Sequence, residues 1–180
     1  MLCLCGTVAA QTTASPGSAK LVSYLFEVFR GDEAILQSMR EQMPTDPKEK
    51  AMMEGSMAAF DANALAARLD VPLSRLLTPQ ESEHCLALIA SDSGTDLAEA
   101  GRRVATLDDL LPELERLPAA RKDAIAAMFE APCFKKTLDY INSADAQQVS
   151  SDYGKSLVCD YLAKTEPETA ALAKQHGLCS

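Results

Sequence analysis

Apolar residues recur every three or four positions along most of this chain, which is the spacing of one face of an α-helix. Between residues 18 and 30, for example, Leu21, Leu25 and Val28 share a face. Comparable segments follow at residues 33–43, 47–69, 79–90, 95–104, 106–117, 118–131, 133–141, 146–163 and 167–177. Short stretches rich in Gly, Pro, Asn and Ser separate them. The pattern therefore predicts an all-α fold, a single-domain bundle of antiparallel helices over residues 18–180.

The clearest helix signals surround residue 78. Thr78 is a good N-cap, and Glu81 stands three residues later, as a capping box requires. The run from Ser91 to Gly94 ends this helix, and either Ser93 or Thr95 is expected to cap the next one. The sequence thus predicts a helix, a break and a second helix in this region.

A leucine-rich segment follows Thr106. Its leucines recur at helical spacing, and acidic residues occupy the first turn, where they favour a helix N-terminus. They are Leu107, Leu110, Leu111, Leu114 and Leu117. We expect this apolar side to face the core.

Methionines gather on the expected helices at 33–43 and 47–69, which a tight turn joins. The residues on the facing stripes are Met39, Met43, Met53, Met57 and Phe60. Methionine is a flexible filler of helical cores, and core packing is its ordinary role. The functional interpretation is an adaptable groove for an apolar ligand or a protein partner. Because thioethers also bind Cu(I), copper handling by this cluster is an alternative.

Composition narrows the classes of partner. The chain has 180 residues, a net charge of -9 and a pI near 4.7. It lacks a Lys/Arg cluster that would neutralise a row of phosphates, so we expect no nucleic-acid partner. Aromatic residues make up only 5% of the chain, which suits helices better than a sheet. We also expect no transmembrane segment.

The N-terminus resembles a secretory leader. Residues 1–10 are apolar and end in small residues, as a signal-peptidase site does, so we interpret them as the remnant of a signal peptide. Residues 11–17 are interpreted as a disordered spacer. Loss of the leader removes Cys3 and Cys5 and leaves an even number of cysteines, which suits two disulfides in a periplasmic or secreted protein. An intracellular protein with buried free thiols is the alternative.

The four remaining cysteines allow three pairings. Cys133 and Cys159 flank the expected turn at residues 142–143, and antiparallel packing would bring them to similar heights, leaving Cys85 to pair with Cys179. The rival arrangement joins Cys159 to Cys179 across the turn at residues 165–167 and is nearly as good. We slightly prefer the first.

Parts of the chain resemble a known family. Residues 18–43, followed by LLTPQESE at 76–83 and IASDSG at 89–94, resemble a bacterial periplasmic helical family, domain of unknown function two-thousand-fifty-nine. That family shows Phe-Thr with a later Glu, then Phe-Tyr, two variable residues and Pro-x-Gly. Here Leu replaces the first Phe, Ile-Ala replaces the aromatic pair, and Asp replaces the proline. The resemblance covers roughly residues 18–104 and implies export and an all-helical fold, with no active site.

Two histidines lie beside cysteines. If Cys85 paired with Cys179, His84 and His176 would approach each other, which makes a weak alternative metal site, although adjacent ligands suit one ion poorly. A thiol enzyme with Cys85 as nucleophile is a further alternative and needs a reactive cysteine.

No familiar catalytic or phosphate-binding motif occurs in the sequence, and we assign no catalytic residue or cofactor. The leading prediction is an exported, non-enzymatic helical protein. We expect it to bind a protein partner in the cell envelope or an apolar small ligand.

Overall fold

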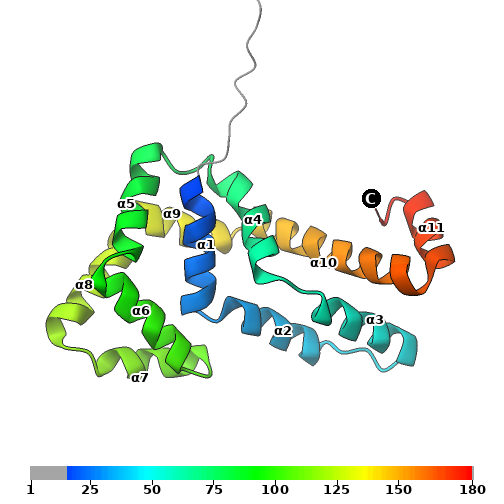
Figure 1. Ribbon diagram of the computed structural model, residues 1–180, viewed down its shortest axis with the longest axis horizontal. Coiled ribbons are helices and arrows are strands. Elements are labelled where there is room, and N and C mark those ends of the chain that lie inside the picture. The colour runs from blue at the N-terminus through cyan, green and yellow to red at the C-terminus, as the bar shows by residue number, and fades with distance from the viewer. Residues whose placement is uncertain (1–15, 180) are drawn as a thin grey trace, which may run out of the picture.

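The computed structural model describes residues 16–179, and every regular element within them is a helix (Figure 1). The helices are α1 (Pro16–Val28), α2 (Gly31–Glu41), α3 (Pro47–Ala58), α4 (Ala62–Leu73), α5 (Pro79–Ile89), α6 (Asp92–Arg103), the 3-10 helix η1 (Leu107–Asp109), α7 (Leu110–Glu115), α8 (Ala119–Glu130), α9 (Pro132–Ile141), α10 (Ala144–Thr165) and α11 (Pro167–Gln175). The all-α prediction is confirmed. The expected leader at 1–10 and most of the spacer at 11–17 lie outside the described residues.

Helix α1 is the centre of the larger half of the molecule. It packs against α4, α5 and α6, as the blue helix in the middle of Figure 1 shows. Its buried side chains are Leu21, Val22, Tyr24, Leu25 and Val28. Burial of each such side chain contributes about 1.5–3 kcal/mol, so this helix supplies a large share of the core.

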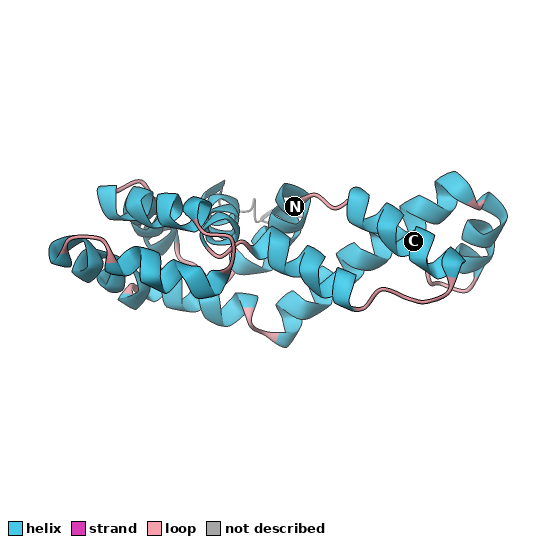
Figure 2. Cartoon of the chain, turned by 90° about the horizontal axis from the view of Figure 1, so that it is seen from below, coloured by secondary structure: helices cyan, strands magenta, loops and turns pink. Residues whose placement is uncertain are grey.

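The other half is an arm built from α2, α3, α10 and α11, which gives the molecule its elongated outline (Figure 2). Helix α3 lies along α10, and α11 folds back on the end of α10. Neither α2 nor α11 has a buried residue, and α3 has only Ser56. Helix α10 supplies the buried apolar residues of the arm, Ala146, Tyr153 and Leu157, and the other three helices are held mainly by half-buried side chains.

The long helix expected at 47–69 is wrong, because the structure breaks it in two. Helix α3 ends at Ala58 and α4 begins at Ala62. The carboxylate of Asp61 accepts hydrogen bonds from the backbone N–H groups of Asn63 and Ala64, at 2.8 and 3.4 Å. This N-cap starts a new helix. The apolar spacing continues across residues 59–61, so the sequence pattern did not indicate the break.

The start of α5 agrees with the sequence prediction. The N–H of Glu81 donates to Thr78 Oγ1 at 3.2 Å, and the N–H of Thr78 donates to Glu81 Oε2 at 2.8 Å. Both bonds of the capping box are thus present. The next helix differs, since Ser91 caps α6 by accepting from the N–H of Gly94 at 3.2 Å, whereas Ser93 lies inside that helix.

Two disulfides are present, but the preferred pairing is wrong. They join Cys85 to Cys133 and Cys159 to Cys179. The alternative prediction, a bridge between Cys159 and Cys179, is therefore confirmed. Helix α10 has 22 residues and α9 has 10. Cys159 lies seven residues farther from the turn at residues 142–143 than Cys133 does, which is roughly 10 Å at 1.5 Å per residue. Cys133 instead faces α5, where its Cα lies 6.1 Å from that of Cys85.

Within residues 16–179, no helix has the length and apolar character needed to cross a bilayer.

Candidate binding site

A hollow of about 430 Å³ lies at the corner where α1 turns into α2. We call it the corner hollow. Six residues that line it are Phe29, Arg30, Glu33, Ala34, Ala105 and Leu107. One wall comes from the start of α2 and the other from the connection between α6 and η1. Most of its wall is apolar, which is the usual character of a binding pocket.

Two exposed leucines, Leu107 and Leu111, follow the connection that forms one wall of this hollow. Their exposed fractions are 53% and 67%. Leu107 lines the hollow, and Leu111 follows four residues later, in α7. The prediction that this leucine-rich side faces the core is therefore wrong for these two residues, although Leu110 is buried. Because η1 and α7 are short, only part of the stripe reaches the interior.

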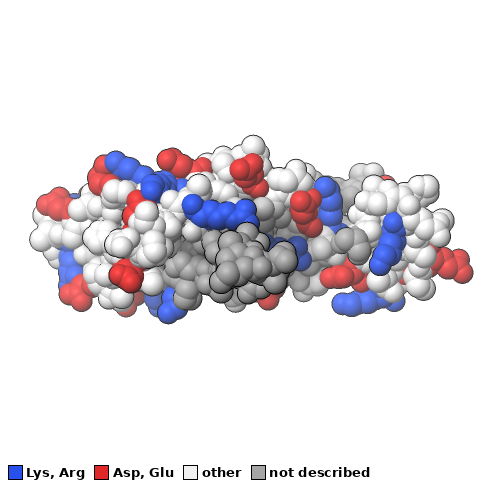
Figure 3. Space-filling model, turned by 90° about the horizontal axis from the view of Figure 1, so that it is seen from above, with Lys and Arg blue, Asp and Glu red and all other residues white. Residues whose placement is uncertain are grey.

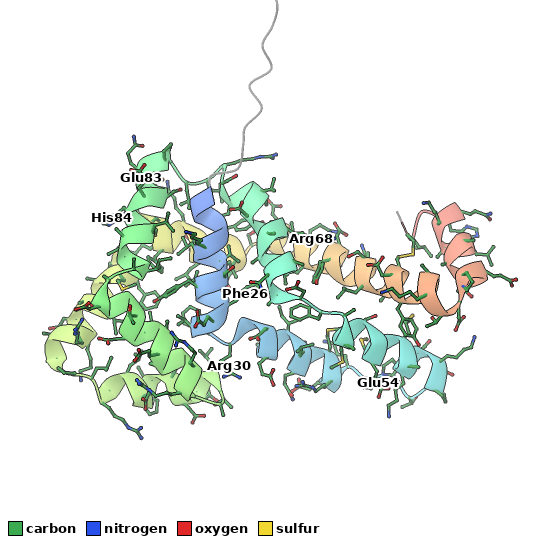
Figure 4. The ribbon with its side chains drawn as sticks, in the orientation of Figure 1. Phe26, Arg30, Glu54, Arg68, Glu83 and His84 are labelled. Carbon is green, nitrogen blue, oxygen red and sulfur yellow. A yellow bond between two sulfur atoms is a disulfide. The ribbon has the colours of Figure 1, made fainter. Side chains whose placement is uncertain are left out.

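Arg30 fixes the shape of the corner. Its backbone is left-handed, with φ of 51°, which is uncommon for a residue with a Cβ. Its Nη1 donates to the carbonyl oxygen of Val104 at 3.2 Å. This bond ties the α1–α2 corner to the α6–η1 connection, and Figure 4 shows Arg30 at this junction. Strained backbone that the surroundings hold in place is a feature of functional sites.

The lining of the corner hollow contains one acidic and one basic side chain, Glu33 and Arg30. Three exposed carboxylates, Asp32, Asp108 and Asp109, lie within two residues of lining residues in the sequence. Glu33 Oε1 lies 3.8 Å from Arg40 Nη1, and Asp109 accepts from the Thr106 hydroxyl at 2.8 Å. On the face seen in Figure 3, basic and acidic side chains are intermixed. The segments that form the corner hollow therefore carry more acidic than basic side chains, which favours a group of positive charge.

A second hollow, of about 550 Å³, opens between α1, α2 and α4. Polar and charged residues, among them Lys20, Glu27, Asp32 and Asn63, make up much of its lining. Tyr24 also lines it, and its hydroxyl donates to the carbonyl oxygen of Gly94 at 2.8 Å. Burial, followed by the charge of Glu27, raises the pKa of Tyr24. Its lining contains three charged side chains, Lys20, Glu27 and Asp32, against two in the corner hollow, so this hollow suits an apolar ligand less well.

The methionines predicted to line a groove lie in the arm. Met39 and Met43 belong to α2 and the turn after it, and Met53 and Met57 belong to α3; all four are half-buried. Phe60 packs against the ring of Tyr153 at a centroid distance of 5.9 Å. None of these methionines lines the corner hollow, the second hollow or a third hollow near the end of α10. A ligand groove or a copper site at these methionines stays a prediction.

The two histidines are not brought together. His84 is exposed on α5, and His176 follows α11 at the other end of the molecule (Figures 1 and 4). The disulfides place Cys85 against Cys133 instead of Cys179, which removes the reason to expect the histidines to meet. Among the described residues, no group of three His, Cys, Asp or Glu side chains is arranged to hold a metal ion.

Each of the four cysteines in the described part of the chain is in a disulfide. A thiol nucleophile at Cys85 would first require reduction of a bridge whose two residues are each 1% exposed.

No family model, no curated protein and no solved structure matches this chain. The resemblance to domain of unknown function two-thousand-fifty-nine therefore stays a prediction.

Proposed function

We propose that this protein is exported and acts by binding a polypeptide segment of a partner at the corner hollow. The segment carries apolar side chains that contact Leu107 and Leu111, and lysine or arginine residues that face the exposed carboxylates nearby. The observation that carries the proposal is the exposure of two leucines four residues apart, Leu107 and Leu111, the first of which lines an apolar hollow.

Apolar burial supplies the driving force. A leucine that moves from full exposure to full burial gains about 1.5–3 kcal/mol, and each of these two has more than half of its side chain in water. Together the two leucines provide enough free energy of burial for a weak but specific contact. The hollow beside them receives one further apolar side chain, which fixes the register of the bound segment.

Charge selects the partner. The chain carries 26 Asp and Glu against 17 Lys and Arg, and Asp32, Asp108 and Asp109 are exposed within two residues of the residues that line the hollow. A basic partner is attracted at long range and held at these carboxylates, whereas an acidic one is repelled.

Disulfide chemistry supports export. Structural disulfides persist in the periplasm and outside the cell and are rare in the reducing cytosol. The part of the chain that the structure describes carries two, and one of them is fully buried between α5 and α9. Expression of the full chain in a bacterium, followed by osmotic shock, tests this point. The protein is expected in the released fraction with its N-terminus at Gln11.

Binding is tested with a designed amphipathic helical peptide that has a leucine face flanked by lysines, labelled for fluorescence anisotropy. The variant Leu107→Ser/Leu111→Ser is expected to weaken binding at least about tenfold, given the apolar area that it removes. The matched control is Val71→Ser/Leu76→Ser, which changes another pair of exposed apolar residues, 49% and 47% exposed. The control is expected to bind as the wild type does.

A second peptide, with glutamate in place of lysine, tests the charge requirement, and equal binding of both peptides would overturn it. Sedimentation of the protein alone identifies a different occupant. If the wild type forms a dimer that Leu107→Ser/Leu111→Ser abolishes, a second copy of this chain fills the hollow and the proposal fails.

A further inference from the structure

The two disulfides have different surroundings. Cys85 and Cys133 are each 1% exposed and lie in the core between α5 and α9. Cys159 and Cys179 are only partly buried, and Cys159 lines a hollow of about 360 Å³ at the end of the arm. Exposed disulfides are the ones that thiols reach and reduce, whereas buried bridges resist.

Two cationic side chains lie beside the Cys159–Cys179 bridge. Arg68 and Lys155 line the same hollow as Cys159, together with Asp152 and Ser156. Lys155 Nζ lies 3.2 Å from the carboxylate of Asp152. Hydrogen bonds from Gln148 and then from Lys155 lower the pKa of Asp152, so this carboxylate stays charged and compensates the lysine.

Arg68 keeps its positive charge available. Its guanidinium lies 5.0 Å above the centre of the Tyr153 ring and its Nη2 donates to Ser156 Oγ at 3.4 Å. Figure 4 shows Arg68 on the side of α4 that faces α10. Within residues 16–179, no carboxylate forms an ion pair with this arginine. The hollow therefore offers a held, uncompensated guanidinium beside a reducible sulfur, which suits a carboxylate.

The bridge is also a main attachment of α11. That helix has no buried residue, and Leu172 and Leu178 are 57% and 71% exposed. The ion pair between Lys48 and Glu166, at 3.4 Å, is a surface contact of small energy. Cleavage of the disulfide therefore frees the segment from Pro167 onward while the core stays folded.

We propose that the Cys159–Cys179 bridge is a thiol–disulfide exchange site for a small thiol that carries carboxylates, of the class to which glutathione belongs. Arg68 holds a carboxylate of the thiol. The thiolate attacks Cys159 Sγ, a mixed disulfide forms there, and Cys179 leaves as a thiolate that takes a proton from water. A second thiolate attacks the sulfur of the bound small thiol, so that two small thiols become one disulfide and Cys159 becomes a thiolate. This activity is independent of polypeptide binding at the corner hollow.

Exchange is measured on the native protein with reduced glutathione, acid quenching, alkylation and peptide mass spectrometry. The glutathione adduct is expected on Cys159, with Cys179 alkylated and Cys85–Cys133 intact. Reduction of both bridges at the same rate, or an adduct on Cys179 alone, overturns the proposal.

Arg68→Gln tests the role of the guanidinium, with Arg75→Gln as the matched control because Arg75 is exposed on the segment after the same helix. The rate with glutathione is divided by the rate with cysteamine, a cationic thiol. This ratio is expected to fall about threefold to fivefold in Arg68→Gln, the effect of one exposed charge, and to be unchanged in Arg75→Gln.

A second measurement on the wild type covers the case in which Arg68→Gln does not fold. Added salt is expected to slow the reaction with glutathione more than the reaction with 2-mercaptoethanol, whose attacking thiolate carries no carboxylate. A glutathione rate that does not depend on salt, or a ratio that Arg68→Gln leaves unchanged, rules out recognition of a carboxylate.

Discussion

Gly101 of α6 lies directly against the backbone of Val28 in α1. A Cβ atom on Gly101 would stand 2.6 Å from the carbonyl oxygen of Val28 and 2.8 Å from its Cα. Backbone atoms cannot rotate away as a flexible side chain does, so these two helices approach at a distance that only glycine permits. The contact positions the end of α1, and therefore the corner that carries Arg30.

Gly101→Ala is expected to lower the free energy of unfolding by about 1–3 kcal/mol, because the added methyl group forces α1 and α6 apart. The control is Gly154→Ala on α10, where a Cβ meets no atom within 4 Å. Alanine there is expected to stabilise the protein by about 0.5–1 kcal/mol, since glycine is unfavourable inside a helix. Urea unfolding measures both, and equal effects of the two changes would contradict the assigned packing.

Local signals were readable from the sequence. The capping box at Thr78 and Glu81 depends on residues three apart, and the structure contains both of its hydrogen bonds. The turn at residues 142–143 was also predicted. The break at Asp61 is local as well, but a continuous apolar stripe concealed it.

Long-range relationships were not readable. The preferred disulfide pairing assumed that Cys133 and Cys159 lie at similar heights beside the turn, whereas α9 packs against α5 and the 22-residue α10 extends beyond it into the arm. Likewise, the stripe from Leu107 to Leu117 did not reveal that two of its leucines face water. Which side of a short helix is covered depends on how the rest of the fold packs against it, which the local pattern does not show.

Glu81→Gln is expected to reduce stability near neutral pH and to have less effect in acid. The hydrogen bond from Lys136, at 2.7 Å, and then that from the Thr78 N–H lower the pKa of Glu81 below its ordinary value of 4.5. A carboxylate of this kind stabilises the folded state above that value, and the contribution is lost as the pH falls through the folded-state pKa.

The measurement is the free energy of unfolding from pH 7 to pH 3, with Glu83→Gln on the same helix as the control. The difference between wild type and Glu81→Gln is expected to shrink below pH 4.5. A difference that stays constant over this range would show that the Glu81 carboxylate is not coupled to folding.

Removal of the two disulfides is expected to have unequal consequences. Cys85→Ala/Cys133→Ala opens a loop of 48 residues in the core and is expected to cost about 4 kcal/mol. Cys159→Ala/Cys179→Ala releases α11, which has no buried residue, and is expected to change global stability by less than about 1 kcal/mol.

Hydrogen exchange distinguishes the two disulfide variants. In Cys159→Ala/Cys179→Ala, the amides of α11 are expected to lose protection while those of α1 keep it. Loss of protection throughout the molecule would show that α11 supports the core.

Tyr140 and Tyr153 form a matched pair for hydroxyl removal. In the described part of the chain, the buried Tyr140 hydroxyl has no hydrogen-bond partner. The Tyr153 hydroxyl accepts from the N–H of Asp61 at 2.9 Å and donates to its carbonyl oxygen at 3.1 Å. Tyr140→Phe is expected to be neutral or to stabilise by up to about 1 kcal/mol, whereas Tyr153→Phe is expected to cost about 1–2 kcal/mol. Thermal unfolding measures both, and a larger loss in Tyr140→Phe would contradict the hydrogen bonding described here.

The central claim is that a basic, apolar polypeptide segment binds at the corner hollow. Its most direct test is an NMR titration of the isotope-labelled protein with the leucine–lysine peptide. The largest saturable shifts are expected at the amides of residues 29–37 and 105–111, on both walls of the hollow. Shifts centred on residues 39–57, where Met43 and Met53 lie, would place binding on the arm and contradict the claim.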